Sequence, residues 1–241
     1  MGRLLQITGL VVGLAGLVLQ LCITVPASME AGRGFVGSLV FYFSFFTILT
    51  NIGAVLVNAS LLSSTGYAWF PAFAAPRMRA GVAVAITLVL IVYAAVLAQL
   101  WQPKGLFLLC DVLLHYVTPL LFVLWWLVAG ADGSTRWRDI SWWMIYPIAY
   151  LAYALLRAPI AGEVPYPFLD VSKHGAASVA VSALAITGLF LMLCIVAVLV
   201  DHGVTRIRAA RVRLPPWPPL ASWHGSRGAC TDRRSSFTGD P

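Results

Sequence analysis

The side chains best suited to chemistry lie inside strongly apolar stretches of this sequence. Asp111 and His115 are four residues apart, so in a helix they stack on one face within reach of each other. A carboxylate beside an imidazole can orient the ring, select its tautomer and raise its basicity. Thr47 supplies a hydroxyl in a second apolar stretch. Because a base can activate a hydroxyl for attack, these residue types could form a nucleophile–base pair.

Thr47 belongs to a polar stripe with helical spacing. Intervals of three, four and seven residues separate Ser44, Thr47, Asn51 and Asn58. This spacing places them on one face of a helix, which lipid would reject, so the face is predicted to point into a bundle. Asn51, one turn from Thr47, is then a candidate donor to an oxyanion, with Ser44 in support.

Purely structural roles explain the same residues. Thr and Ser in membrane helices commonly bond their own backbone, and Asn often joins two helices. A buried His–Asp pair can equally be a satisfied polar contact. Spacing by itself therefore leaves both interpretations open.

The composition predicts an all-α polytopic membrane protein. Hydrophobic types make up 60% of the 241 residues, and charged types only 10%, against roughly 25% in soluble domains. A six-transmembrane-helix bundle over residues 1–214 follows, because each apolar stretch is close to the ~20 residues that cross a bilayer. The six predicted spans are 4–25, 37–62, 79–101, 105–128, 141–160 and 176–200.

The basic residues predict the orientation. If the N-terminus is cytoplasmic, the cytoplasmic segments hold Arg3, Arg77, Arg79, Arg136, Arg138 and seven arginines from Arg206 to Arg234. The opposite side holds Arg33, Lys104, Arg157 and Lys173. The excess predicts a multi-pass protein of the cell membrane with both termini cytoplasmic. Residues 215–241, rich in Pro, Ser and Arg, read as a disordered cytoplasmic tail.

This topology puts the two candidate groups at one depth. Thr47 lies ten residues beyond Gly37, and His115 lies ten beyond Gly105. At 1.5 Å per residue both are roughly 15 Å into the membrane, near its midplane.

The segment 157–174 is a third candidate element, because Pro165 and Pro167 exclude a regular helix there. It could cover the mouth of a pocket, or it could be a rigid aromatic anchor at the interface. Arg157 could meet an anionic headgroup or carboxylate, although snorkelling is the commoner fate of such a side chain. The candidates for a substrate pocket are Tyr150, Arg157, Tyr166 and Asp170.

The first span offers two further alternatives. Gly9 and Gly13 form a GxxxG pattern, which favours close packing against a neighbouring helix, with a homodimer face as the alternative. Val25–Ala27 loosely fits a signal-peptide cleavage site, but the apolar run is longer than such peptides have, so a retained span is favoured.

Other site types are not indicated. The cysteines form no CxxC pair, the four histidines have no metal-binding spacing, and no phosphate-binding loop is present, so neither a metal nor a cofactor is predicted. The basic excess lies in the tail next to a span, which suits membrane lipids and not nucleic acid.

Three segments occur in an order that resembles a known family. They are Phe46-Thr47, the His115 segment that ends in Pro119–Phe122, and Tyr166–Asp170. Together they resemble the androgen-induced and androgen-dependent integral membrane protein family, including its bacterial six-span relatives. The resemblance covers roughly residues 4–200.

The resemblance implies an activity and two residues. Animal members of that family are intramembrane hydrolases of fatty acid esters of hydroxy fatty acids, which use a threonine nucleophile and a histidine. The threonine falls on Thr47 and the histidine on His115. The spacing from His115 to the next proline differs by one from the animal pattern, and Asp170 stands where the animal proteins have Glu.

Two functions are therefore expected, in order. The first is intramembrane hydrolysis of a lipid ester, with Asp111 orienting His115. The alternative is a non-enzymatic protein that binds or transports a lipid or small amphiphile. Transporters often show inverted repeats and interrupted helices, and the two halves of this sequence show no convincing repeat.

Overall fold

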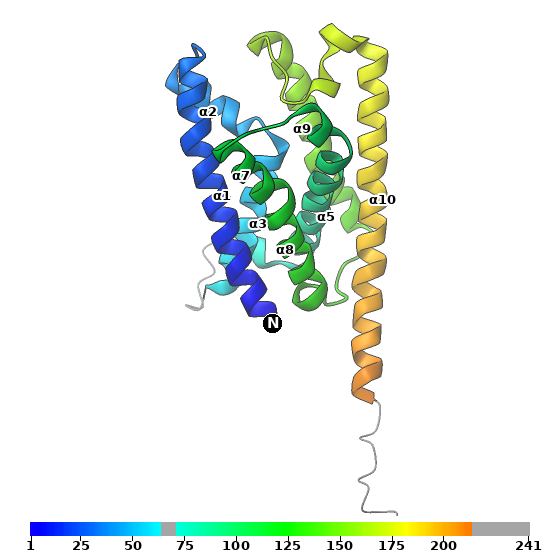
Figure 1. Ribbon diagram of the computed structural model, residues 1–241. Coiled ribbons are helices and arrows are strands. Elements are labelled where there is room, and N and C mark those ends of the chain that lie inside the picture. The colour runs from blue at the N-terminus through cyan, green and yellow to red at the C-terminus, as the bar shows by residue number, and fades with distance from the viewer. Residues whose placement is uncertain (64–70, 214–241) are drawn as a thin grey trace, which may run out of the picture.

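The computed structural model describes residues 1–63 and 71–213, which are helical without a β-strand (Figure 1). The predicted tail at 215–241 lies outside the described residues. The longer helices are α1 (Gly2–Glu30), α2 (Phe35–Phe43), α3 (Phe46–Leu62), α5 (Pro76–Val92), α7 (Leu106–Val112), α8 (Thr118–Trp125), α9 (Asp139–Ala161) and α10 (Val171–Arg213). Shorter segments are α4 (Pro71–Ala74), η1 (Tyr93–Leu97), α6 (Ala98–Leu100), η2 (Leu113–Val117), η3 (Trp126–Gly130) and η4 (Pro167–Leu169).

The helices match the predicted polytopic bundle. Five of them are long and apolar enough to cross a membrane: α1, Pro76–Leu100, Leu106–Gly130, α9 and Val171–Arg208. A sixth crossing is counted if α2 and α3, which are bent by 74° at their junction, form one span. The all-α bundle is thus confirmed over the described residues.

The second predicted span is not one continuous helix, which corrects the expectation for 37–62. Phe45 is extended (φ −90°, ψ 129°) and separates α2 from α3. Side chains satisfy the backbone groups that the break frees. The Ser44 hydroxyl donates to the Val40 carbonyl at 2.5 Å, and the Tyr150 hydroxyl donates to the Ser44 carbonyl at 2.9 Å. Contacts across the bundle therefore stabilise a break that the hydrophobic pattern does not reveal.

The third and fourth spans are each interrupted by a π-helical turn. In the third span the turn is η1, which begins at Tyr93, and in the fourth it is η2, which contains His115. A π-turn adds one residue to the helical repeat and is frequent at functional sites. It changes the direction in which nearby side chains leave the helix.

The glycine face of α1 is used inside the chain. A Cβ at Gly9 would lie 3.1 Å from Asn58, and one at Gly13 would lie 3.0 Å from Val55 of α3. The predicted close packing is confirmed, since α1 packs against α3 and α8 as a member of the bundle. The same contacts cover this face, so it is not open to a second copy of the chain.

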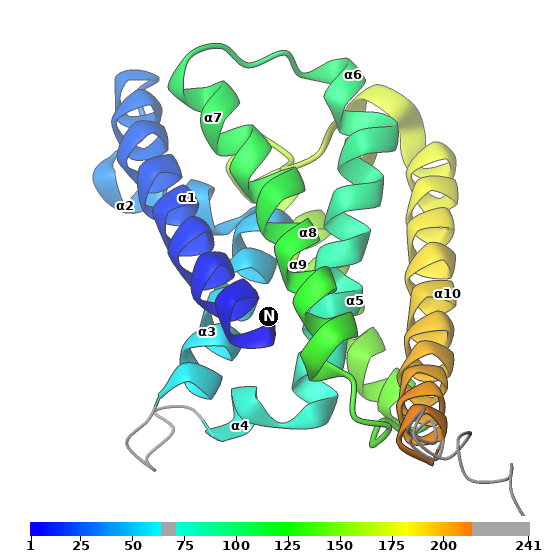
Figure 2. The same cartoon turned by 60° about the horizontal axis from the view of Figure 1, so that its bottom comes forward.

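The bundle has two ends, which are named here for what lies at them. The N-terminal end is where α1 begins, and the loop end is where α9 and α10 are connected (Figure 1). Helix α5 packs against α3, α8 and α10 (Figure 2). Beyond the other helices, α10 extends past the N-terminal end.

A buried carboxylate anchors α10 at the N-terminal end. Asp201 accepts the backbone N–H groups of Asp132, Gly133 and Thr135 at 2.9–3.1 Å, and the Thr135 hydroxyl at 2.7 Å. These bonds satisfy backbone N–H groups in the connection between η3 and α9. Because α10 also lines the cavity described below, this anchor helps to hold one wall of that cavity.

Candidate active site

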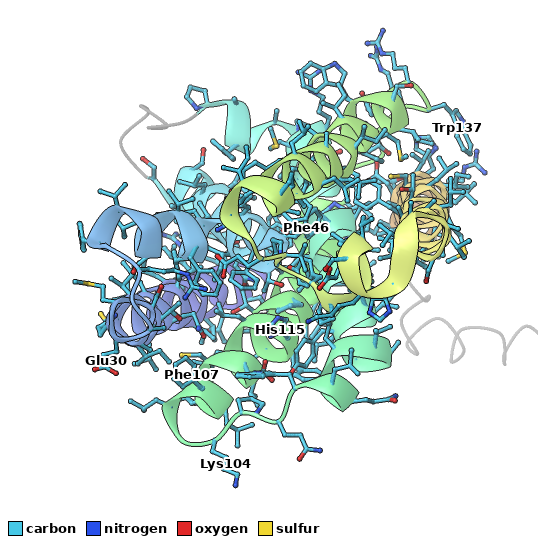
Figure 3. The ribbon with its side chains drawn as sticks, turned by 90° about the horizontal axis from the view of Figure 1, so that it is seen from above. Glu30, Phe46, Lys104, Phe107, His115 and Trp137 are labelled. Carbon is cyan, nitrogen blue, oxygen red and sulfur yellow. The ribbon has the colours of Figure 1, made fainter. Side chains whose placement is uncertain are left out.

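Thr47 and His115 come together in the middle of the bundle. Thr47 is the second residue of α3, and its Oγ1 lies 3.2 Å from Nε2 of His115 in η2. Figure 3 shows His115 near the centre of the bundle. Phe46, the residue before Thr47, also lies near the centre. The equal depth of Thr47 and His115 was not enough to predict this contact. It also depends on how each helix is rotated about its own axis. The pair is mostly shielded, with Thr47 only 6% exposed.

The other ring nitrogen of His115 faces Asp111. Nδ1 lies 3.2 Å from the Asp111 carboxylate and 3.1 Å from the Asp111 carbonyl oxygen. Both partners only accept hydrogen bonds when the carboxyl is ionised, so the hydrogen of neutral His115 is assigned to Nδ1. Nε2 then presents its lone pair to the Thr47 hydroxyl, which is the arrangement that a general base needs.

Tyr93 is a site residue that the sequence reasoning missed. Its hydroxyl donates to the second carboxylate oxygen of Asp111, and its ring stacks on His115 with centroids 3.8 Å apart. A signal was available, because Tyr93 lies eight residues from Trp101 at the end of the third apolar stretch. That spacing places it about 12 Å deep, close to the depth of His115.

The first turn of α3 brings hydrogen-bond donors to Thr47. The first backbone N–H groups of a helix have no acceptor within the helix, and its N-terminus carries partial positive charge. The N–H of Thr47 points at the Tyr166 hydroxyl at 3.3 Å, and that hydroxyl lies 3.5 Å from Thr47 Oγ1. Negative charge that develops beside Thr47 would therefore meet the helix N-terminus and the Tyr166 hydroxyl.

The roles expected of Asn51 and Ser44 differ from what the structure shows. The Asn51 amide nitrogen donates to the carbonyls of Thr47 at 2.8 Å and Leu114 at 3.1 Å, so both its hydrogens are committed. Asn51 joins α3 to η2 and is not an oxyanion donor in this arrangement. Ser44 lies at the break, where its hydroxyl contacts Val40 and the Tyr153 hydroxyl.

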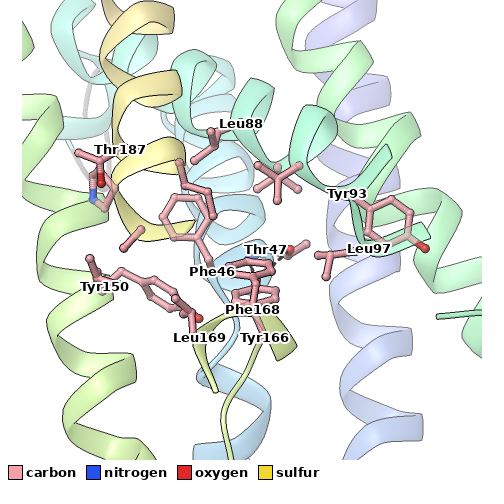
Figure 4. Close-up of a pocket in the computed structure, with 16 residues that line it drawn as sticks. Phe46, Thr47, Leu88, Tyr93, Leu97, Tyr150, Tyr166, Phe168, Leu169 and Thr187 are labelled. Atoms are coloured by element: carbon pink, nitrogen blue, oxygen red, sulfur yellow. Dashed lines mark hydrogen bonds between the residues drawn. The ribbon is translucent and has the colours of Figure 1, made fainter. Parts of the chain in front are cut away.

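An apolar cavity of about 80 Å³ adjoins Thr47. Of the predicted pocket residues, Tyr150 and Tyr166 line it, together with Phe168 and Leu169 of the α9–α10 connection (Figure 4). That connection therefore reaches into the bundle beside Thr47. Helices α5, α9 and α10 supply apolar walls that include Leu88, Val92, Pro147, Leu151, Ala183 and Ile186.

The other two predicted pocket residues lie elsewhere. Arg157 donates to Glu163 at 2.9 Å and lines a separate cavity between α2 and α9. Asp170 caps the start of α10 by accepting the N–H groups of Ser172 at 3.1 Å and Lys173 at 3.3 Å. The Ser172 hydroxyl bond is the main cause that lowers the pKa of Asp170 below its ordinary value. Neither side chain lines the Thr47 cavity, because each is held by local partners.

Across residues 1–63 and 71–213, no three His, Cys, Asp or Glu side chains gather as a group that could hold a metal ion. Comparison with protein-family models, with curated proteins and with solved structures gave no match. The geometry of this site therefore carries the functional inference.

Proposed function

We propose that this protein is an intramembrane hydrolase of lipid esters, with Thr47 as nucleophile and His115 as general base. The observation that carries the proposal is one line of contacts, from the Thr47 hydroxyl through both nitrogens of His115 to Asp111. The apolar cavity beside Thr47 suits an acyl chain. The resemblance to the androgen-induced and androgen-dependent family points to the same two residues.

The first half of the reaction forms an acyl-enzyme. Thr47 Oγ1 attacks the ester carbonyl carbon while Nε2 of His115 takes the hydroxyl proton. The Asp111 carboxylate stabilises the resulting imidazolium, and the carbonyl oxygen becomes an oxyanion near the α3 N-terminus and Tyr166. As the carbonyl re-forms, His115 returns the proton to the leaving alkoxide. An alcohol departs and the acyl group remains on Thr47.

The second half restores the enzyme. His115 takes a proton from water, whose oxygen attacks the acyl carbon of the Thr47 ester. When this second tetrahedral intermediate collapses, the proton passes from His115 to Thr47 Oγ1. The fatty acid leaves, so each cycle consumes one ester and one water and releases one acid and one alcohol.

One observation favours the second candidate, a non-enzymatic carrier of a lipid or small amphiphile. The break between α2 and α3 is an interrupted helix of the kind found at transporter binding sites, where a half-helix N-terminus faces the substrate. The same N-terminus serves an oxyanion in the hydrolase proposal. Turnover, and not binding, distinguishes the two functions.

The test uses purified protein in nanodiscs, assayed for hydrolysis of fatty-acid esters and for labelling by a fluorophosphonate probe. Wild type is expected to turn over and label, Thr47→Ala and His115→Ala to do neither, and Thr47→Ser to retain activity because it keeps the hydroxyl. Matched controls are Thr50→Ala, one turn further along α3, and His174→Ala, at the exposed start of α10.

Two outcomes would contradict the hydrolase. One is folded wild type that is inert towards a panel of lipid esters and towards the probe. The other is hydrolysis that survives in Thr47→Ala. Saturable binding of an amphiphile by the inert protein would then support the carrier.

A further inference from the structure

A second cavity, of about 570 Å³, lies between α2 and α9 near the loop end. It shares no lining residue with the Thr47 cavity. Its wall is apolar along the two helices and includes Val40, Leu156 and Ile160. The charged side chains that line it are Arg33, Arg157 and Glu163. The lining of the cavity thus combines an apolar wall with a charged group.

The charged group at this cavity is ordered by ion pairs. Arg157 donates to one carboxylate oxygen of Glu163 at 2.9 Å, and Arg33 donates to the other. Burial raises the pKa of Glu163, but the hydrogen bonds from Arg157 and Arg33 outweigh it and hold that pKa below its ordinary value. With Glu163 ionised, two guanidinium groups and one carboxylate leave a net charge of +1.

The two arginines retain capacity for a further anion. Each guanidinium carries five N–H donors in a planar fork, which matches the oxygens of a phosphate. Within the described residues, the hydrogen bond of the Arg157 side chain is to Glu163, while Arg33 also contacts Ser28 and the Phe41 ring. Glu163 therefore positions both forks without saturating them.

The side chains of the apolar wall are exposed, so a lipid chain can contact them. Val40 is 47% exposed, Leu156 71% and Ile160 87%. Val40 on α2 lies seven residues after Arg33, while Leu156 and Ile160 on α9 flank Arg157 in sequence. An amphiphile can therefore lay its chain on this wall while its head reaches the arginines. In a bilayer, the end of the bundle is also where headgroups lie.

We propose that this cavity binds a net-anionic phospholipid. Its headgroup phosphate accepts the N–H groups of Arg33 and Arg157 that Glu163 leaves free, and an acyl chain lies against Val40, Leu156 and Ile160. A phosphodiester with an uncharged headgroup carries one negative charge, which complements the net charge of +1. Phosphatidylcholine has the same phosphate but no net charge. The site is separate from Thr47 and does not depend on the proposed hydrolysis.

The experiment measures lipid adducts on the delipidated full-length protein by native mass spectrometry, with phosphatidylglycerol and phosphatidylcholine of identical acyl chains. Wild type is expected to prefer phosphatidylglycerol. Replacing both arginines, as Arg33→Gln with Arg157→Gln, is expected to weaken phosphatidylglycerol binding by roughly tenfold or more, because charge-assisted bonds are lost. Lys104→Gln, a charge loss at the same end outside the cavity, should leave the preference unchanged.

Glu163→Gln distinguishes a lipid-binding site from a clasp, meaning a set of ion pairs that only stabilises the fold. It keeps the side-chain shape and raises the charge of the group from +1 to +2, so phosphatidylglycerol binding should tighten. A clasp alone predicts lower thermal stability in the Glu163 and arginine variants with no change in lipid preference, which would overturn the proposal. Equal wild-type binding of the two lipids would also overturn it, as would a Lys104→Gln loss as large as that of the double variant.

Discussion

Thr47 has three neighbours that change what a threonine hydroxyl can do. Nε2 of His115 is 3.2 Å away to take its proton, and Thr47 lies in the first turn of α3, where the helix N-terminus carries partial positive charge. Tyr166 adds a hydroxyl at 3.5 Å. A hydroxyl is a weak nucleophile without a base, so these contacts distinguish Thr47 from Thr50, whose hydroxyl bonds Tyr146.

Asp111→Asn tests the orienting role of the carboxylate. The amide cannot stabilise an imidazolium and can turn His115 to the wrong tautomer, so kcat should fall by roughly 10²- to 10⁴-fold with little change in KM. Steady-state kinetics on a lipid ester would measure both constants. Asp132→Asn, at the N-terminal end, is the control. Unchanged kcat in Asp111→Asn would remove this carboxylate from the mechanism.

Tyr166→Phe tests the hydroxyl as an oxyanion donor. Losing one such donor typically lowers kcat by about 10²-fold while the ground-state complex is little affected. Tyr153→Phe is a matched control, since its hydroxyl contacts Ser44 and not Thr47. Equal activity of the Tyr166 and wild-type proteins would leave the backbone N–H groups as the oxyanion donors.

Among the helices, three site residues each lie at an irregular turn. Thr47 follows the break after α2, Tyr93 begins η1, and His115 lies in η2. In a regular helix, the position of a residue sets the direction in which its side chain leaves the helix axis. A break or a π-turn changes that direction by part of a turn. Three irregular spans thus aim their side chains at one point in the bundle.

The glycine face of α1 predicts a stability effect at Gly13. A Cβ there would lie 3.0 Å from Val55 and 3.3 Å from Thr118, so Gly13→Val should destabilise the bundle by about 1–3 kcal/mol. The thermal unfolding midpoint in detergent measures this. Gly188→Val on α10 is the control, because a Cβ at Gly188 meets nothing within 4 Å. Equal midpoints for the two variants would contradict the packing role of Gly13.

At the scale of the whole molecule, polar groups are arranged by depth. The candidate site lies inside, and ion pairs lie at both ends: Arg33 and Arg157 with Glu163 at the loop end, and Arg79 with Asp132 at 2.7 Å at the N-terminal end. The excess of Arg at the N-terminal end predicts that this end faces the cytoplasm.

Cysteine accessibility tests that orientation. In a background without the native cysteines, Lys173→Cys at the loop end should react with a membrane-impermeant maleimide on sealed cells. Arg138→Cys at the N-terminal end should react only after the membrane is permeabilised, since the bilayer blocks the reagent. The reverse pattern would place both termini outside. Both positions are exposed in the structure, so access through the protein is not the variable.

The helical class, the approximate spans and the shared depth of Thr47 and His115 could all be predicted from the sequence. Apolar length and residue spacing report position along a helix, and that one coordinate is read directly from the chain. The i, i+4 contact of Asp111 with His115 was predictable for the same reason, because both residues share one helix.

Which of the predicted residues belong to the site depends on how the helices pack, and the sequence could not predict that. Spacing cannot report how helices rotate against one another, or where contacts from another helix stabilise a break. The bond from Tyr150 to the Ser44 carbonyl joins residues 106 positions apart and supports the turn that sets Thr47 at a helix N-terminus. Asn51 bonds across to Leu114, and Tyr93 reaches Asp111, through contacts of the same long-range kind. These side chains acquire their roles only when the helices pack.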